Sequence, residues 1–221
     1  MSTEVPTIPP ARMGSAAQRG RIEIKRDGKT SVVLFQFNPS SLRRKLSPKM
    51  VGGNSESKAT PLYFTGPPVE TIDVRFELAA DEAGTEIPWK DVKEHGVRPM
   101  LAALETAMYP QSDQIESAEK KLRSGKMEIG VFGVPLITFI WGECKAPVKF
   151  TSMSVTEQQF NKKLVPTLAT VDLSMQVLTV EDVRNTDDAH GIYLAYQKNK
   201  EKLAKKCFSK NSAAKDGASK A

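Results

Sequence analysis

The chain has 221 residues, 39% hydrophobic and 26% charged, an ordinary balance for a soluble protein that can bury a core. No apolar run approaches the length needed to span a bilayer, and the N-terminus lacks the basic-then-apolar order of a secretory signal. Cytoplasmic synthesis and residence are therefore expected. The two cysteines, Cys144 and Cys207, cannot form a disulfide framework, and we expect free thiols.

The net charge of +6 lies at the C-terminus, because residues 198–221 contain eight lysines against Glu201 and Asp216. The rest of the chain is neutral. A basic tail on a neutral body is typical of a solubilising or loosely docking terminus. It also leaves open one alternative function, a nucleic-acid-binding module that uses the lysine-rich tail.

The N-terminal third begins with residues 1–20, whose Pro, Ser, Ala and Gly content predicts a flexible arm. Two β-prone runs then flank Asp27-Gly28, a pair typical of a hairpin turn because both positions need positive φ. The second run, residues 32–37, is apolar on both faces, which predicts a strand inside the structure. Residues 46–68 contain Gly-Gly, Asn, Ser and Pro and predict a long loop, often a functional feature.

The middle of the chain changes its apolar period. Residues 69–78 alternate between apolar and charged side chains, which predicts a half-buried strand. Apolar residues between 97 and 108 then recur at helical spacing, and Tyr109-Pro110 closes that segment. A short charged helix is expected over 114–123.

The second half is mostly strand. Strands are predicted over residues 135–141, 148–160 and 168–180, and the loop 161–166 joins the last two as a hairpin. A final helix is expected from about 187 to 207, with an apolar stripe formed by Ile192, Tyr196, Leu203 and Cys207. About six strands with helices between and after them predict a curled antiparallel sheet with helices at its edge.

Catalytic chemistry has few candidates in this sequence. His95 and His190 are the only histidines, and together with the two cysteines they show no metal-ligand spacing. The sequence has no nucleophile elbow and no phosphate-binding glycine loop. Paired acids occur at Asp81-Glu82 and Asp187-Asp188, and such pairs in polar stretches are normally solvated. We therefore expect no enzyme activity, no catalytic, cofactor-binding or metal-binding residue, no cofactor and no small-molecule substrate.

A nucleic-acid interface would be expected to interleave aromatic and basic residues on a sheet face. The aromatic residues instead lie in apolar runs, which favours core positions: Phe35, Phe37, Phe139 and Trp141. One other basic cluster follows the first hairpin, Arg43-Arg44-Lys45, and a solvated loop is the simpler interpretation.

Three motifs occur in a fixed order. The first is a strand ending in Phe37-Asn38-Pro39 with Leu42 three residues later. The second is the apolar run 135–142, which ends in Trp-Gly after a helix and a polar segment. The third is a strand, a short loop with an aromatic residue and a Pro-led return strand, within 148–177. This set resembles the tube-related proteins of contractile, phage-tail-like injection systems, and is most similar to the tube initiator or baseplate hub adaptor.

The resemblance implies an α+β, mainly β fold: a phage-tail-tube-like curled antiparallel β-barrel with one flanking helix and a C-terminal helix. Domains are expected as a flexible N-terminal arm (1–20), a tube-like β-barrel domain (21–185), a C-terminal helix (186–208) and a disordered lysine-rich tail (209–221). Longer adaptors of this family carry a LysM module after the tube-like domain, and residues 186–221 are too short for one.

The partners implied by the resemblance are copies of the chain itself in a ring of six, the inner tube protein, and spike, hub and baseplate proteins. The ring would connect the tube to the spike and template tube assembly within a cytoplasmic injection particle, without membrane insertion by this chain. A β-module with free edges is a liability alone, but a closed ring pairs those edges with neighbours.

Overall fold

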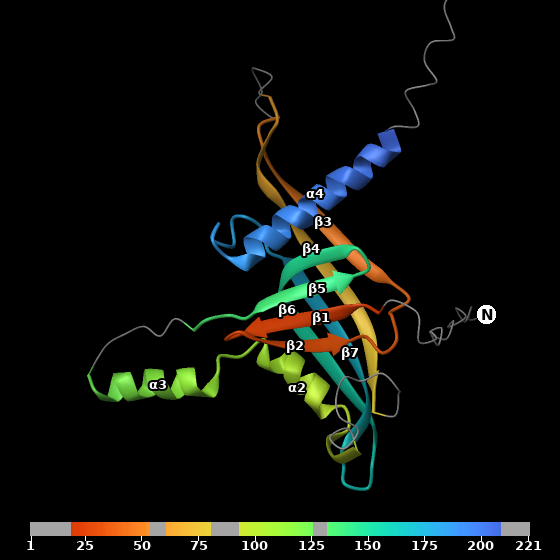
Figure 1. The fold of residues 1–221 in the computed structure, drawn as a ribbon, viewed down its shortest axis with the longest axis vertical. Coiled ribbons are helices and arrows are strands. Elements are labelled where there is room, and N and C mark those ends of the chain that lie inside the picture. Colours follow the sequence, from red (N-terminus) through yellow and green to blue (C-terminus); the bar gives the residue numbers. More distant parts are fainter. Residues whose placement is uncertain (1–18, 54–60, 81–92, 126–131, 209–221) are drawn as a thin grey trace, which may run out of the picture.

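The computed structural model describes residues 19–53, 61–80, 93–125 and 132–208. In these residues seven strands form one antiparallel sheet in the order β2-β1-β5-β6-β7-β4-β3 (Figure 1). The elements in chain order are β1 (Arg21–Arg26), β2 (Lys29–Leu34), β3 (Leu42–Val51), β4 (Tyr63–Ala79), α2 (Arg98–Thr106), α3 (Ser112–Arg123), β5 (Leu136–Trp141), β6 (Cys144–Phe160), β7 (Pro166–Val177) and α4 (Asp188–Phe208).

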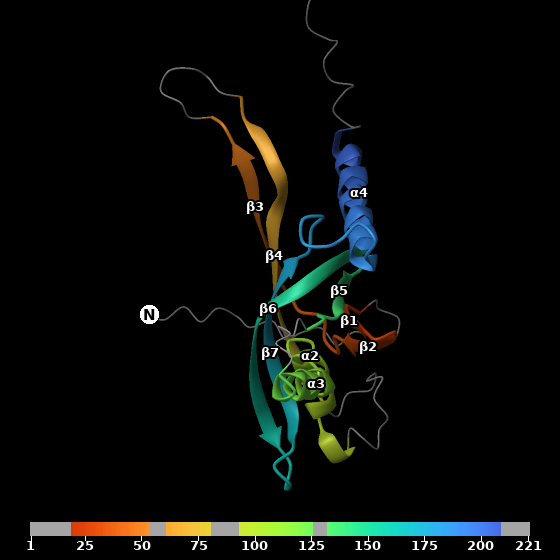
Figure 2. The same ribbon diagram turned by 90° about the vertical axis from the view of Figure 1, so that its left-hand side faces the viewer.

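The sheet is open, so the prediction of a closed barrel was wrong. β2 and β3 end the strand order, and neither pairs with a second strand among the described residues. β5 joins β6 only between Ile137↔Val148 and Trp141↔Cys144. Figure 2 shows β5, β1 and β2 on one side of the remaining four strands, so the sheet folds over at this short junction. Because β3 continues away from β2, the two outer strands do not meet.

The core lies between these two layers. Strand pairs place alternate residues of β4 and β7 on one face, as the period of two predicts. Phe35 packs against Phe76 with ring centroids 4.5 Å apart, which joins the layers. α2 closes one end of the core. The largest fully buried side chains are Phe35, Phe139, Ile22, Ile72, Leu78, Leu104, Leu173, Met175, Val33, Val97, Val148 and Val171.

The first hairpin is confirmed, and its turn residues Asp27 and Gly28 have φ of 49° and 76°. β2 ends at Leu34 and is an edge strand, so the prediction of an interior strand over 32–37 was wrong. The run is apolar on both faces for another reason. Val33 and Phe35 enter the core, and α2 contacts β2. Gln36, also buried, donates a hydrogen bond from Nε2 to the Ala79 carbonyl at 2.7 Å.

The long loop predicted over 46–68 is instead two strand ends, because β3 runs to Val51 and β4 starts at Tyr63. Glycine and proline suggested a loop, but this part of β4 pairs only with β3 and therefore tolerates residues that a central strand would reject. The pairing shifts register between Ser47 and Met50. The centre of the predicted loop, residues 54–60, lies outside the described residues.

The predicted helices are confirmed at α2, α3 and α4, but the predicted stripe of α4 is confirmed only at Tyr196, with Ile192 half-buried. Ala189, Tyr193 and Tyr196 are the buried residues of α4, whereas Leu203 and Cys207 are exposed. The reason is geometric: the second half of α4 passes beyond the sheet and has little to pack against (Figure 1). Residues 1–18 of the predicted flexible N-terminus and the tail 209–221 lie outside the described residues.

Candidate functional site

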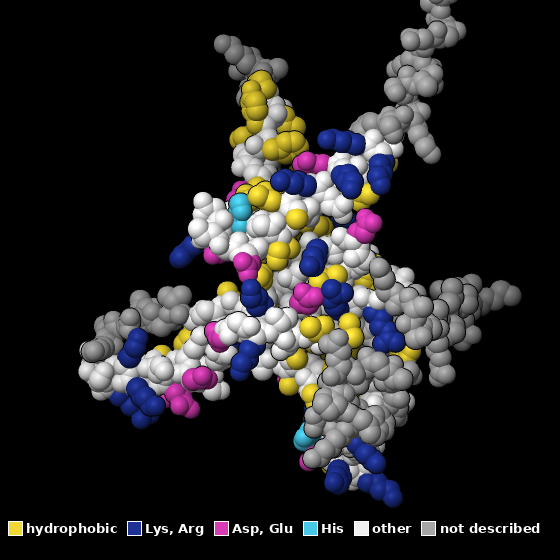
Figure 3. Space-filling model, viewed as in Figure 1, with side chains coloured by type: hydrophobic (Ala, Val, Ile, Leu, Met, Phe, Trp, Pro, Cys, Tyr) yellow, Lys and Arg dark blue, Asp and Glu magenta, His cyan; other side chains and the backbone are white. Residues whose placement is uncertain are grey.

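The most exposed apolar surface is a two-stranded projection that we call the arm, residues 46–51 of β3 and 63–70 of β4. β4 pairs with β7 only from Thr71 onward, so the arm has no other strand beside it. Figure 3 shows hydrophobic side chains covering it, with Phe64 77% exposed. Its exposed apolar residues, with the adjoining Leu62, are Leu46, Met50, Val51, Leu62, Tyr63 and Phe64.

Strands β6, β7, β4 and β3 form a four-stranded unit that we call the panel, and both of its outer edges are open. Nine of the ten residues of β3 are exposed. At the other edge β5 covers β6 only up to Val148, and beyond it β6 has β7 as its single described neighbour. Most residues between Thr151 and Phe160 are exposed on that strand. Such edges present unpaired backbone N–H and C=O groups to any strand that approaches.

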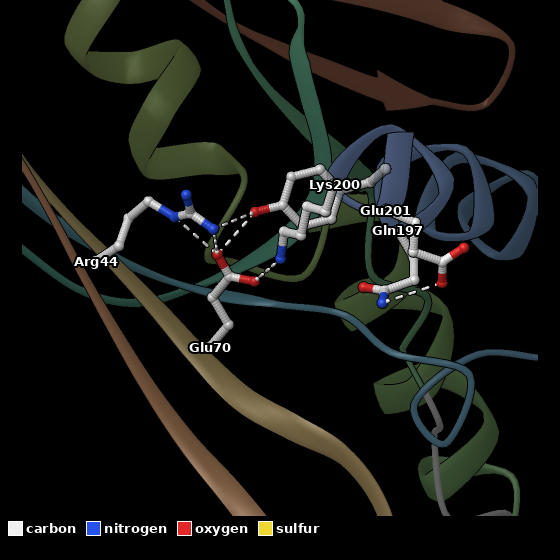
Figure 4. A network of polar contacts seen from close by, with 6 residues as sticks. Arg44, Glu70, Gln197, Lys200 and Glu201 are labelled. Carbon is white, nitrogen blue, oxygen red and sulfur yellow. Dashed lines mark hydrogen bonds and ion pairs between the residues drawn. The ribbon is translucent and has the colours of Figure 1, made fainter. Parts of the chain in front are cut away.

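A buried carboxylate anchors the base of the arm to α4. Glu70, 3% exposed, accepts hydrogen bonds from Arg44 Nε at 2.9 Å, Tyr196 Oη at 2.7 Å and Lys200 Nζ at 2.6 Å (Figure 4). Burial favours a raised pKa for Glu70, but the hydrogen bonds from Lys200, Tyr196 and Arg44 outweigh it and lower the pKa. The carboxylate is therefore charged at neutral pH and holds two strands and a helix together.

The contact with Glu70 also changes the pKa of its partner Tyr196. Burial raises the pKa of Tyr196, and the hydrogen bond that Tyr196 donates to Glu70 raises it further. Lys200 lies over the Tyr196 ring, 3.9 Å from its centroid. A second ion pair, Lys49 to Glu181, ties the arm to the segment that follows β7. The arm therefore projects from a polar anchor and has no apolar core of its own.

Beside the start of the free β6 edge lies a groove of about 930 Å³. Its apolar lining includes Met108, Val134, Leu136 and Phe150. Charged lining residues are mostly acidic, with four aspartates and two lysines: Asp27, Asp182, Asp187, Asp188, Lys25 and Lys149. The groove lining thus combines apolar side chains with a majority of acidic over basic ones.

The residues considered for catalysis are not brought together. His95 is exposed and His190 is half-buried. Asp188 pairs with Lys25 at 2.7 Å, and Asp187 accepts a hydrogen bond from the Arg184 backbone. Over the described part of the chain no group of three or more His, Cys, Asp or Glu residues could hold a metal ion. The pair Asp81-Glu82 lies outside the described residues, and both cysteines are free thiols.

The basic and aromatic candidates for nucleic-acid binding are also separate. Arg43, Arg44 and Lys45 lie on β3, so the prediction of a solvated loop for them was wrong, and Arg44 is an anchor of Glu70. Phe35 and Phe139 are buried in the core as predicted. The described lysines of the C-terminal charge lie along α4, with Lys198, Lys202, Lys205 and Lys206 exposed.

Each of the three sequence motifs has a structural role. Asn38 accepts a hydrogen bond from the Gly20 backbone at 2.9 Å, and Gly142 has φ of 57° in the β5–β6 turn. Asn161 accepts hydrogen bonds from the Lys163 and Val165 amides, which closes the β6–β7 turn. These motifs position strand ends.

Sequence reasoning missed the arm and the role of Glu70. One signal was present for Glu70, because it lies in phase with the core residues Ile72 and Val74. A carboxylate at a core-phase position needs a cationic partner. No comparable signal marks the open edge of β6, because an edge is defined by which strand is missing beside it.

No protein-family model matches the chain. A search of curated proteins also gave no significant match. Within the described residues, none of the helices combines the length and the apolar character required to cross a membrane.

The solved structures that are similar to this chain include two from gene transfer agent particles. One is a chain from the tail of an empty gene transfer agent particle with C6 symmetry, at 12% identity and a TM-score of 0.29, covering 72% of this chain and 90% of that one. The other is from the virion of a native gene transfer agent particle, at 14% identity and a TM-score of 0.27, covering 71% and 90%. Both TM-scores are below 0.5, and neither similarity carries a conclusion about function.

Proposed function

We propose that this protein is a non-enzymatic structural subunit of a phage-tail-like particle, which assembles into a ring by pairing the open edges of its panel with those of neighbouring copies. The observation that carries this proposal is the pair of open, exposed edges on β3 and β6. The three sequence motifs support the same class of protein.

The strand directions suit a closed ring. The panel has an even number of antiparallel strands, so β3 and β6 run in opposite directions. When copies are related by rotation about an axis, β3 of one copy therefore meets β6 of the next in antiparallel orientation. This head-to-tail contact is heterologous, and such contacts close into rings when the rotation divides a full turn.

The two faces of the panel differ, which indicates how it would be oriented. Figure 2 shows α2, α3, α4 and the β5-β1-β2 layer all on one side of the panel. The opposite face carries polar side chains, among them Arg43, Asp73, Arg75, Asp172 and Ser174, which line a shallow pocket. We place this polar face toward the central channel, because the bulk of the domain then lies on the outside of the ring.

The finer assignment follows from the sequence resemblance. We propose six copies in the ring, a position between the inner tube and the spike-bearing hub, and a role as the template for the first layer of tube. α4 projects away from the domain and would contact the layer above or below. The inner tube protein, the hub and the baseplate proteins are the proposed partners.

The first test is the assembly state of the purified chain, alone and with the products of neighbouring genes. We expect sedimentation and electron microscopy to show rings with an open channel. T156K places a charge in the middle of the open β6 edge and should weaken ring formation, because edge lysines disfavour strand pairing. S117K, a matched change on the exposed surface of α3, should leave it unchanged.

A chain that stays monomeric under all these conditions would refute the proposal. Binding to DNA or RNA that is lost on truncation before Lys198 would then favour the lysine-rich nucleic-acid module. Equal effects of T156K and S117K would show that the rings are held together by another surface.

A further inference from the structure

We infer that β3 of one copy pairs with β6 of the next in one particular register, with Leu46 opposite Val155, and that this register delivers the apolar arm into the groove of the neighbour. The inference rests on the proposed ring and adds its partner surfaces.

The two open edges are staggered within one copy. Paired residues connect Leu42 to Val74, Val74 to Leu173 and Leu173 to Met153, so these four lie level across the panel. From that level β3 continues in one direction, into the arm, whereas most of the open β6 edge, from Met153 to Gln159, extends in the other. If the strands ran parallel to the ring axis and all copies lay at the same height, β3 of one copy would therefore overlap only the end of the open β6 edge of the next.

Face matching restricts the possible registers. Leu46 pairs with Glu70, and Val155 pairs with Val171, so both side chains lie on the core face of the panel. Residues opposite each other in a continuous sheet must share a face, and a slip of one residue would place Leu46 opposite an outward-facing residue. Only every second register remains.

Side-chain chemistry selects among the remaining registers. With Leu46 opposite Val155, Arg44 faces Glu157 of the neighbour, an exposed acid that forms no ion pair with the described residues. An apolar pair and an opposite-charge pair are both favourable across strands. A slip of two residues would place Arg44 opposite Val155. The reverse slip would place it opposite Gln159, which has no charge to pair with Arg44.

The register also fixes the inclination of the strands. It places Leu42 opposite Gln159 of the neighbour, six residues along β6 from the level residue Met153. That stagger is about 20 Å, and four strands span about 19 Å, so the strands would tilt about 45° from the ring axis. Strands in closed barrels tilt by about 35–45°. The stagger of the two edges therefore gives a strand tilt within the range found in closed barrels.

The groove lies where this pairing would lead the arm. β3 of the neighbour, continuing beyond Ser47, passes β6 in the direction of Phe150, which lines the groove. The arm ends in the apolar side chains of Met50, Val51 and Phe64. Of the four cations of β3, only Lys49 lies within the arm, and the groove lining has four aspartates and two lysines. The arm thus matches the groove in its apolar character.

The register can be read by cross-linking between copies. In a chain with Cys144→Ser and Cys207→Ser, the pair L46C and V155C should form disulfides between neighbours on oxidation, giving a ladder of covalent oligomers that stops at the ring size. Opposite positions have the required Cα separation of about 4.4–6.8 Å, and positions two residues apart exceed it. The pair L46C and M153C is therefore the matched control and should not cross-link.

Cross-linking of the control pair, or of neither pair in particles that form rings, would overturn the register. Amide hydrogen exchange of the unmodified protein gives a second measurement that needs no cysteine. Assembly should slow exchange in residues 43–47 and 154–158 at least tenfold, and unchanged exchange in assembled rings would also overturn the inference. Absence of rings in the unmodified protein would instead refute the proposed function.

Discussion

The core between the two layers and the arm use their apolar side chains in opposite ways. Where β1, β2 and β5 fold over the panel, Phe35, Phe76 and Phe139 are fully or nearly fully buried and pack against one another. In the arm, Phe64 and Tyr63 are mostly exposed, although they belong to the same strand as Phe76. One strand thus contributes buried side chains to the monomer core at one end and exposed apolar side chains at the other. In the proposed ring, the neighbouring copy covers this surface.

The largest expected difference in stability comes from the same truncation at two positions of β4. Phe76→Ala should lower the free energy of unfolding by about 3–5 kcal/mol, because it empties a space in the core. Phe64→Ala should change it by less than about 0.5 kcal/mol in the monomer, since the side chain is already in water. Urea unfolding of both variants measures the contrast. Similar losses would show that the arm is part of the folding core.

The anchor between these regions should have the next largest effect. Glu70→Gln removes the charge that Arg44 and Lys200 share, and we expect a loss of about 1–3 kcal/mol because one of the two charged acceptor oxygens is replaced by an amide donor. Glu77→Gln, an exposed acid on the same strand, is the matched control and should be nearly neutral. Urea unfolding and amide exchange of α4 measure the effect. Equal stability of the two variants would remove Glu70 as the anchor.

The same anchor predicts a pH dependence with a definite sign. The pKa of Glu70 is lowered in the folded state, so the unfolded chain binds this proton more readily. The stabilisation is complete above the ordinary carboxyl pKa and is lost as pH falls through the lowered value. The stability difference between the unmodified protein and Glu70→Gln should therefore be constant near neutrality and shrink in acid. Urea titrations from neutral to acidic pH test this, and a constant difference throughout would contradict it.

The core was largely predictable because its residues repeat. The alternation in residues 69–78 and the helical spacing between 97 and 108 both report a single buried face, and the structure confirms them. The turn at Asp27-Gly28 was predictable because backbone sterics restrict such φ values.

The arm and the open edges were not predictable for a physical reason. A strand pair exposed on both faces has no alternation to read, and its glycine and proline content suggests a loop. Closure into a barrel depends on whether β2 and β3 meet, which local sequence does not specify. The α4 stripe was predicted only in part: Tyr196 is buried as expected, whereas Leu203 lies beyond the sheet and is exposed, because helical spacing does not report where the sheet ends.

The variant with the smallest expected effect on monomer stability, Phe64→Ala, should have a large effect on assembly. Phe64→Ala removes the most exposed aromatic side chain of the arm tip. In the proposed assembly, this phenyl group enters the groove of the neighbouring copy. Burying an aromatic side chain at an interface contributes about 1.5–3 kcal/mol, so the association constant of each contact should fall about tenfold or more. Sedimentation at several protein concentrations measures it.

Leu122→Ala is the matched control for this change, because Leu122 is also an exposed large apolar residue but lies on α3, outside the arm and the groove lining. It should leave association unchanged. If both variants assembled normally, the apolar tip would have no role in holding copies together. If Phe64→Ala alone failed to assemble while unfolding normally, the contrast within β4 would hold: one end of the strand folds the monomer, and the other end joins it to its neighbour.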